Sequence, residues 1–401
     1  MKAGWRLCPL GSIAEIKAGN SAPQAKESFV GGIHPFFRTA DAGRVRFGTI
    51  FESDDYLNED GIKGLRLFPK GTILFPKSGA STFLNHRVML GVDGYVSSHL
   101  ATILADRSQA ECGYLLYFLR TIFTQDLIQD HAYPSLNLLD IASIKVILPP
   151  LPEQRRIVGI LDKAFERIAT AKANAEKNLQ NARALFRSQL QNSFSPQDEQ
   201  WIETKLANEI DFLAGFAFKS AQYTDSSDGV RLLRGDNIVQ DAIRWEDARK
   251  WSLYDIRGYN RYQLNQGDVV LAMDRPWVKA GLKHAMIKEI DLPCLLVQRT
   301  ARLRCGDRLN ERFLKYLIGS EAFAKHILSV QTGSGVPHIS GQQILDFAFK
   351  MPSKVEQCRI ADNLDSFRED TLCLESIYQR KVILLDELKK SILHPAFNGA
   401  L

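Results

Sequence analysis

The architecture of this chain follows from twelve residues, Ile147-Leu148-Pro149-Pro150-Leu151-Pro152-Glu153-Gln154-Arg155-Arg156-Ile157-Val158. A weaker copy runs from Met351-Pro352 to Ile360, with Glu356-Gln357 in place of Glu153-Gln154, 203 residues further on. Prolines followed by apolar residues at helical spacing are typical of the start of a helix. Self-similarity over half of the chain predicts two equivalent halves.

Further matches extend the repeat toward the N-terminus of each half. Trp5, Arg38 and Gly71 match Trp201, Arg234 and Gly267 at an offset of 196, whereas Pro134 matches Pro337 at 203. The second copy therefore carries seven more residues than the first. The repeat predicts one architecture used twice.

An apolar stripe follows each proline-rich start, in alternating steps of three and four residues. Each stripe spans about 40 residues, or roughly 60 Å of helix, which exceeds the diameter of a domain of about 150 residues. A stripe of this kind usually packs on its own domain, but its length favours pairing with the equally long second copy. We expect an antiparallel coiled coil with these seam residues: Ile157, Leu161, Ile168, Leu179, Ile360, Leu364, Phe367, Leu374 and Leu385.

Short strand-like runs separated by Gly- and Asp-containing turns, with fewer helices, indicate mixed α/β (α+β) segments between the long helices. The sequence predicts four parts. They are a globular segment at 1–150, a long helix at 151–196, a second globular segment at 197–352 and a second long helix at 353–401. Two equivalent halves in one chain also predict a pseudo-two-fold relation.

Composition narrows the class of protein. The 401 residues are 45% hydrophobic and 24% charged with a net charge of +5, which permits a nucleic-acid partner without requiring one. Six cysteines stand at scattered spacings, so neither a disulfide framework nor a zinc site is expected, and a reducing cytoplasm is the expected compartment. The sequence contains neither a signal peptide nor a stretch of about 20 apolar residues, so no membrane association is expected.

Catalytic motifs are missing from the sequence. It contains no G-x-G-x-x-G after a strand, no P-loop, no G-x-S-x-G and no H-E-x-x-H, and its eight histidines never stand at metal-ligand spacing. We therefore predict no catalytic residue and no metal site.

The two proline-rich helix starts resemble the conserved helix of specificity subunits of type I restriction–modification enzymes. Val96-Ser97-Ser98-His99-Leu100-Ala101 and Leu271-Ala272-Met273-Asp274-Arg275-Pro276 also resemble that family, and the resemblance covers the whole chain. It implies a non-catalytic subunit whose two target recognition domains read the two halves of a bipartite, asymmetric sequence in double-stranded DNA. The long helices would set the gap between the two half-sites.

The resemblance also implies the partners. Two methyltransferase subunits would bring S-adenosylmethionine and methylate adenine, and restriction and translocase subunits would bring ATP and Mg and cut unmodified DNA. This chain would bind no cofactor itself. Three alternatives stay open: a methylation-only system, a coiled-coil adaptor that spaces two protein-binding domains, and an enzyme with an unrecognised site.

Candidate DNA contacts are side chains that donate or accept hydrogen bonds and lie on predicted loops. In the first segment they are Arg38, Thr39, Lys77, Ser78, Ser81, Thr82, Asn85, His86, Arg87, Tyr133, Ser135 and Asn137. In the second they are Arg234, Asn237, Arg275, Trp277, Lys279, Arg299, Arg302, Ser334 and His338.

The repeat separates these candidates into two kinds. Arg38 and Arg234 recur in both halves, so they favour support of the fold or a phosphate contact over base reading. His99 is interpreted as a hydrogen-bonded structural histidine. Positions that differ between the halves, such as Asn85 to Arg87 and Arg275 to Lys279, are better candidates for reading bases.

Overall fold

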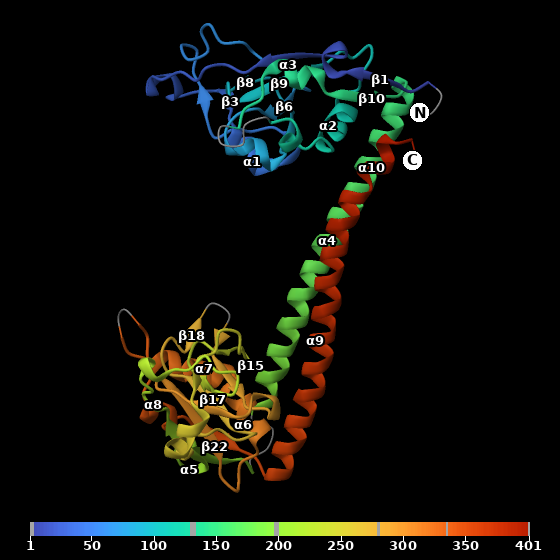
Figure 1. Ribbon diagram of the computed structural model, residues 1–401. Helices are drawn as coiled ribbons and strands as arrows, with labels where there is room; N and C mark the ends of the chain where they lie inside the picture. The colour runs from blue at the N-terminus through green and yellow to red at the C-terminus, as the bar shows by residue number, and fades with distance from the viewer. Residues whose placement is uncertain (1–3, 129–133, 196–199, 279–280, 334–335, 400–401) are drawn as a thin grey trace. The chain divides into compact units, whose positions relative to one another are not determined.

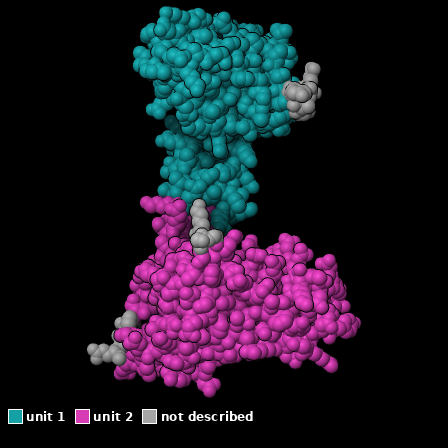
Figure 2. Space-filling model, turned by 90° about the vertical axis from the view of Figure 1, so that its left-hand side faces the viewer, with its two compact units in different colours: residues 1–176, 379–401 teal, residues 177–378 magenta. Residues whose placement is uncertain are grey.

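The computed structural model describes residues 4–128, 134–195, 200–278, 281–333 and 336–399, and the chain forms two compact units (Figures 1 and 2). Unit 1 comprises Met1–Glu176 and Gln379–Leu401, and unit 2 comprises Lys177–Tyr378. The division between the units runs through both long helices, α4 (Leu151–Ser193) and α9 (Lys354–Ser391). Each unit thus holds one globular part together with one end of each long helix.

Unit 1 is built around a five-stranded sheet in the order β2-β9-β6-β7-β4, beside a three-stranded sheet β5-β3-β8 and the pair β1-β10. The strands are β1 Arg6–Pro9, β2 Ala14–Ala18, β3 His34–Phe37, β4 Phe47–Ile50, β5 Tyr56–Leu57, β6 Ile73–Pro76, β7 Arg87–Leu90, β8 Tyr95–Val96, β9 Leu100–Ala105 and β10 Lys145–Leu148. Its other helices are α1 Thr39–Val45, α2 Cys112–Arg120, α3 Leu138–Ser143 and α10 Leu393–Phe397.

Unit 2 contains a four-stranded sheet β12-β22-β17-β20, a three-stranded sheet β16-β13-β21 and the pairs β11-β23, β14-β15 and β18-β19. The strands are β11 Ile202–Lys205, β12 Ile210–Ala214, β13 Val230–Leu233, β14 Ile238–Val239, β15 Ala242–Ile243, β16 Lys250–Trp251, β17 Val269–Ala272, β18 Trp277–Val278, β19 Gly281–Leu282, β20 His284–Met286, β21 Cys294–Leu296, β22 Thr300–Cys305 and β23 Ala348–Met351. Its other helices are α5 Leu206–Glu209, α6 Glu311–Ile318, α7 Glu321–Val330 and α8 Gly341–Leu345.

The same local arrangement recurs inside each unit. In unit 1 the first strand pairs antiparallel with the strand before α4, and in unit 2 β11 pairs in the same way with the strand before α9. The matched glycines Gly71 and Gly267 both precede a central strand with positive φ, +91° and +87°, a backbone conformation that side chains resist. The predicted mixed α/β class with two long helices is confirmed.

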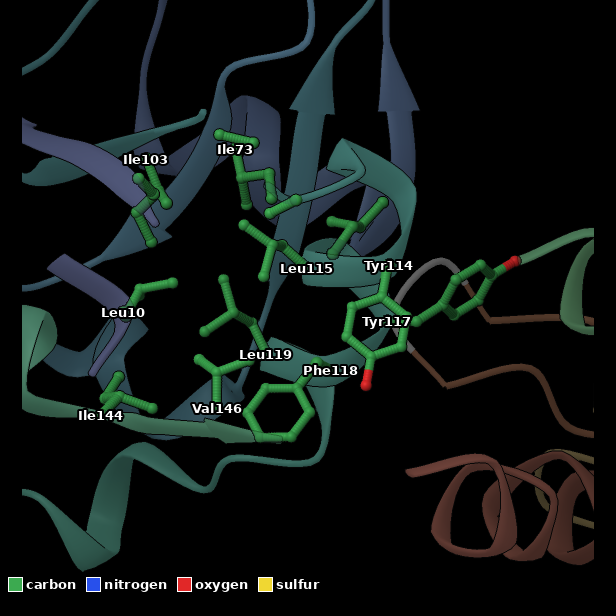
Figure 3. Packing of buried hydrophobic residues seen from close by; sticks show 14 of the residues in the cluster. Leu10, Ile73, Ile103, Tyr114, Leu115, Tyr117, Phe118, Leu119, Ile144 and Val146 are labelled. Atoms are coloured by element: carbon green, nitrogen blue, oxygen red, sulfur yellow. The ribbon is translucent and has the colours of Figure 1, made fainter. Parts of the chain in front are cut away.

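The core of unit 1 forms where α2 packs on the central sheet (Figure 3). Glu111 caps α2 by accepting hydrogen bonds from the backbone N–H groups of Gly113 and Tyr114. Six consecutive residues of this helix, 114–119, are buried, because α2 lies between the sheet on one side and α4 and α10 on the other. The aromatic ring of Phe397 in α10 packs edge-on against Tyr114 and Phe118 at 5.3 Å.

The long helices pair antiparallel within each unit. In unit 1 Lys172 of α4 bonds Asp386 of α9 at 2.7 Å, and in unit 2 Arg183 of α4 bonds Glu375 of α9 at 2.9 Å. The 203-residue repeat relates Lys172 to Glu375 and Arg183 to Asp386, so the two bridges are equivalent contacts of a self-complementary pair. The basic partner lies on α4 and the acidic partner on α9 in both bridges. Two copies of α4 would place like charges opposite each other, so the charges favour pairing of α4 with α9.

The seam departs from the prediction in two places. Ile157, Leu161, Ile360 and Leu364 pack into the globular cores of their own units. Leu374 is 41% exposed. The next residue of α9 after the buried Thr371 that faces α4 is Glu375, four positions on, and not Leu374, three positions on. The partly buried carboxylate of Glu375 is compensated by Arg183 and Arg368. Ile168 is buried, and Leu179, Phe367 and Leu385 are half-buried as expected for a seam.

Candidate nucleic-acid interface

A buried glutamine joins each long helix to its globular part. Gln154 is fully buried, and its amide donates to the carbonyl groups of Pro149 and Gln109 at 2.8 and 2.9 Å while its Oε1 accepts from the N–H of Glu111 at 2.8 Å. Every polar atom of this side chain is used, so the start of α4 is held against the start of α2.

Gln357 makes the same three contacts in unit 2. Its amide donates to the carbonyl groups of Pro352 and Arg308 at 2.9 and 3.1 Å, and its Oε1 accepts from the N–H of Asn310 at 2.8 Å. The Glu-Gln pair that marks the repeat in the sequence therefore has a structural purpose, which is to fix the helix to the domain. We call Gln154 and Gln357 the glutamine clamps.

A tyrosine–aspartate hydrogen bond reinforces each clamp. The Tyr117 hydroxyl donates to Asp162 on α4, and the Tyr316 hydroxyl donates to Asp365 on α9, both at 2.6 Å. Burial raises the pKa of both tyrosines, and the neighbouring carboxylates raise it further. Both hydroxyl groups therefore keep their protons and act as donors at neutral pH.

Two loops of unit 1 are paired by backbone hydrogen bonds where β6 ends. The N–H of Gly79 donates to the carbonyl of Pro134, and the N–H of Leu136 donates to the carbonyl of Lys77. The N–H of Lys77 in turn donates to the carbonyl of His99. This framework places Ser78, Ser135 and His99 together, and the Ser78 hydroxyl lies 2.8 Å from Nδ1 of His99.

Unit 2 builds the same framework from different residues. The N–H of Arg275 donates to the carbonyl of Pro337, and the N–H of Ile339 donates to the carbonyl of Met273. The N–H of Met273 donates to the carbonyl of Arg299. Each of these three bonds has a counterpart in unit 1, so the sequence repeat relates the two frameworks. We call each framework the paired loops of its unit.

The side chains on the paired loops differ in chemistry. Where unit 1 places Ser78, His99 and Ser135, unit 2 places Asp274, Arg299 and His338, and Arg299 lies 3.6 Å from Asp274. The His338 ring lies 3.0 Å from the Thr332 hydroxyl. Arg275 and Trp277 are exposed beside them. One backbone framework thus carries two hydroxyl groups and an imidazole in one unit, and a carboxylate, a guanidinium and an imidazole in the other.

Four predicted DNA contacts are buried and so are not available to DNA in this structure. The Arg87 guanidinium is fully buried over the ring of Phe75 and donates to the Thr124 hydroxyl, and burial lowers its pKa to about 9. Thr82 is fully buried, with its hydroxyl donating to the Gly79 carbonyl. Arg302 is 5% exposed and pairs with Asp211, and Asn237 is 8% exposed and closes a backbone turn.

Several other predicted residues have structural contacts of their own. Arg38 pairs with Asp55 and lies over the ring of Phe36, and Arg234 pairs with Asp236. Asn137 caps α3 through a hydrogen bond from the N–H of Asp140. Ser81 donates to the Ser78 carbonyl, and Thr39 is the first residue of α1. Arg38 and Arg234 remain candidates for phosphate contacts because their side chains are 40% and 43% exposed.

The contacts of Asn85 and His86 are with helices α1 and α2 and not with the paired loops. Asn85 donates to the carbonyl of Arg120 at the end of α2, and His86 lies beside Gly43 of α1. Tyr133, Lys279 and Ser334 lie outside the described residues. Sequence reasoning missed Lys283, which is half-buried near Asp236 and Asp274, and it interpreted His99 only as structural. His99 stands in one of the stretches that resemble the family, but no motif marks Lys283, and the paired backbone shows what surrounds each residue.

Within the described ranges, no group of three or more His, Cys, Asp or Glu side chains could hold a metal ion. None of the helices drawn from those residues combines the length and the apolar character that crossing a membrane requires.

Comparison with known proteins agrees with this arrangement. The family described as type I restriction modification DNA specificity domain matches residues 2–180. The type I restriction enzyme MjaVIII specificity subunit of Methanocaldococcus jannaschii is 25% identical over 413 residues, which cover 98% of this chain and 92% of that protein. The type I restriction enzyme EcoAI specificity subunit of Escherichia coli is 37% identical over 170 residues, which cover 42% of this chain and 28% of that protein.

Two solved structures share the fold over the full chain. A chain from a study of complex assembly and conformational transition of the type I R-M system has a TM-score of 0.78 and 19% identity, covering 100% of this chain and 99% of that one. The HsdS subunit from Thermoanaerobacter tengcongensis has a TM-score of 0.66 and 20% identity, covering 100% of this chain and 98% of that one.

These matches identify residues 2–180 as similar to a DNA specificity domain, in a fold that combines two globular parts with two long helices. Over its full length the chain is similar to a type I restriction–modification specificity subunit, and residues 2–180 match the DNA specificity domain of that family. The resemblance of the two helix starts is thereby confirmed.

Proposed function

We propose that this specificity subunit reads a bipartite, asymmetric DNA sequence, with one set of paired loops for each half-site. The observation that carries the proposal is the equivalence of the two backbone frameworks together with the difference between their side chains. A common framework places polar groups in the same way, and different groups recognise different base edges. The two half-sites should therefore differ.

The paired loops provide the groups that base reading requires. In unit 1 the hydroxyl groups of Ser78 and Ser135 and the imidazole of His99 can each donate or accept a hydrogen bond. In unit 2 Arg275 and Arg299 offer the bidentate donors that suit guanine. Arg38 and Arg234 would contact phosphates and set the position of the domain.

The long helices would separate the two recognition domains and dock two methyltransferase subunits. Six apolar side chains on α9 are 41–53% exposed, which is unusual for a helix facing water only. They are Leu372, Leu374, Ile377, Ile383, Leu384 and Leu388. In this proposal the methyltransferase subunits hold S-adenosylmethionine and methylate adenine, and the restriction and translocase subunits hold ATP and Mg. The chain itself carries out no catalysis, and the reducing cytoplasm is its compartment.

The experiment that tests this proposal is methylome sequencing of the source strain with and without the gene. Loss of one bipartite adenine-methylation motif, restored by the wild-type gene, is the expected result and gives both half-sites. If every motif persists although methyltransferase subunits co-purify with the chain and the complex is active on other DNA, the proposal of a bipartite target fails.

The same experiment separates the alternatives. A methylation-only system gives the same lost motif, but no cleavage of unmethylated plasmid in the strain. A coiled-coil adaptor gives no lost motif and no co-purifying methyltransferase.

A further inference from the structure

Unit 1 contains a pocket of about 1190 Å³ that the proposed DNA reading does not use. It lies between α1, the end of α2 and the short helix α10, and its apolar walls include Phe47, Phe118 and Phe397. Phe123 and Leu84 at this pocket are 61% and 59% exposed. The volume is that of a small-molecule site rather than a packing defect.

The charges around this pocket have one sign. Arg46, Arg120 and Lys390 line it, with His86 and His394, and none of the described lining residues carries a carboxylate. The positive charges also act on one another: Arg120 adds to burial in lowering the pKa of Lys389, and Arg46 adds to burial in lowering the pKa of His86. The pocket therefore favours an anion.

Arg120 supplies the second observation. Its guanidinium lies 4.2 Å from the centre of the Phe47 ring, and its buried Nη1 has no hydrogen-bond partner in the structure. Arg120 lines the pocket, so its charge lies against an aromatic wall where it can attract an incoming oxygen. The geometry resembles a receptor for a carboxylate, sulfonate or phosphate attached to a flat apolar body.

We propose that this pocket binds a small amphipathic anion, with its charged group on Arg120 and Arg46 and its apolar part against the phenylalanine rings. A DNA duplex carries its phosphates on its outer, convex surface. Those phosphates would not enter a concave pocket with aromatic walls, so we do not assign the pocket to the DNA backbone. Because α10 forms one wall, the bound anion would also hold the C-terminal helix on the globular part of unit 1.

The test uses the intact chain and the aryl sulfonate 8-anilinonaphthalene-1-sulfonate, whose fluorescence reports apolar binding. Arg120→Met removes the charged partner. Gly43→Leu places an apolar side chain at the pocket and keeps every charge; a Cβ at Gly43 would contact only His86, at 3.7 Å, and Gly43 lies within helix α1. Both variants should raise the Kd of the probe at least about tenfold, Arg120→Met because it loses one charge-assisted contact and Gly43→Leu because its side chain occupies the space of the probe.

Arg44→Gln is the matched control, since Arg44 lies on the same helix but outside the pocket and pairs with Asp54. Its Kd for the probe should stay within about twofold of the wild type. Gly43→Leu keeps the test valid if Arg120→Met fails to fold. Equal affinities of all the folded variants for the probe would overturn the proposal. Displacement of the probe by a short DNA duplex would also overturn it.

Discussion

At the scale of single residues, the two glutamine clamps fix each long helix to its globular part. Gln154 and Gln357 look like ordinary polar residues at the start of a helix, and only their contacts show that each satisfies three buried backbone groups. The sequence repeat made both residues visible, but it could not reveal their partners. Two of the three partners of each clamp lie more than 40 residues away along the chain.

Gln154→Ala tests the clamp in unit 1. It leaves the N–H of Glu111 and two carbonyl groups without a partner, so we expect a loss of stability of about 2–4 kcal/mol. Thermal unfolding followed by circular dichroism measures the effect. Gln180→Ala is the control, because Gln180 is exposed on the same helix and should change stability by less than about 0.5 kcal/mol. An equal loss in both variants would contradict the clamp.

Arg299→Gly tests base reading in unit 2. Arg299 has a φ of +65°, which glycine adopts without strain, and its side chain is 65% exposed. Loss of one base contact of about 1–3 kcal/mol should weaken binding to the second half-site about 10- to 100-fold and leave the first half-site unchanged. Fluorescence anisotropy of the assembled methyltransferase with duplexes altered in one half-site measures this.

The control for that measurement is Arg308→Ala. Arg308 is similarly exposed in the same unit and pairs with Glu209, away from the paired loops. It should leave the preference for both half-sites as in the wild type. If Arg308→Ala and Arg299→Gly weaken binding to every duplex alike, Arg299 contributes general charge and not specificity.

At the scale of elements, the N-terminal turns and the middle of each long helix make different contacts. The N-terminal turns pack into a globular core through residues such as Leu161 and Leu364, whereas the middle pairs with the other helix through small residues such as Ala175 and Ala182. A single apolar stripe in the sequence merges these two tasks, because both need apolar residues at the same spacing. The contacts separate them.

Ala175→Asp places a charge in the middle of the helix pair. Ala175 is 1% exposed, so the carboxylate would be buried without a designed partner, and we expect a loss of about 2–5 kcal/mol. The fall in Tm should appear in the helical signal at 222 nm. Ala173→Asp two residues earlier is exposed and should leave Tm within about 2 °C. Unchanged melting of Ala175→Asp would show that the helices do not depend on this contact.

At the scale of the whole molecule, the sequence predicted the repeated architecture and the long helices because periodicity and duplication are local, countable patterns. It could not identify the candidate site in the same way. Arg87 and Ser78 are both polar residues on predicted loops, yet one is fully buried and the other lies on the paired loops. Which of two such residues faces outward depends on strand pairing over long distances, and no single segment encodes that pairing.

The repeat leads to a prediction about the DNA target itself. Because the same antiparallel pairing occurs in both units, inserting seven residues into the middle of α4 and seven into the middle of α9 keeps every seam residue in register. Each helix becomes about 10 Å longer, which corresponds to about three base pairs of B-DNA. The methylated motif should keep both half-sites and gain about three unspecified base pairs between them, as read by methylome sequencing. Insertion into α4 alone breaks the register and should abolish methylation. A motif with an unchanged gap in the double insertion would show that the helices do not set the spacing between the half-sites.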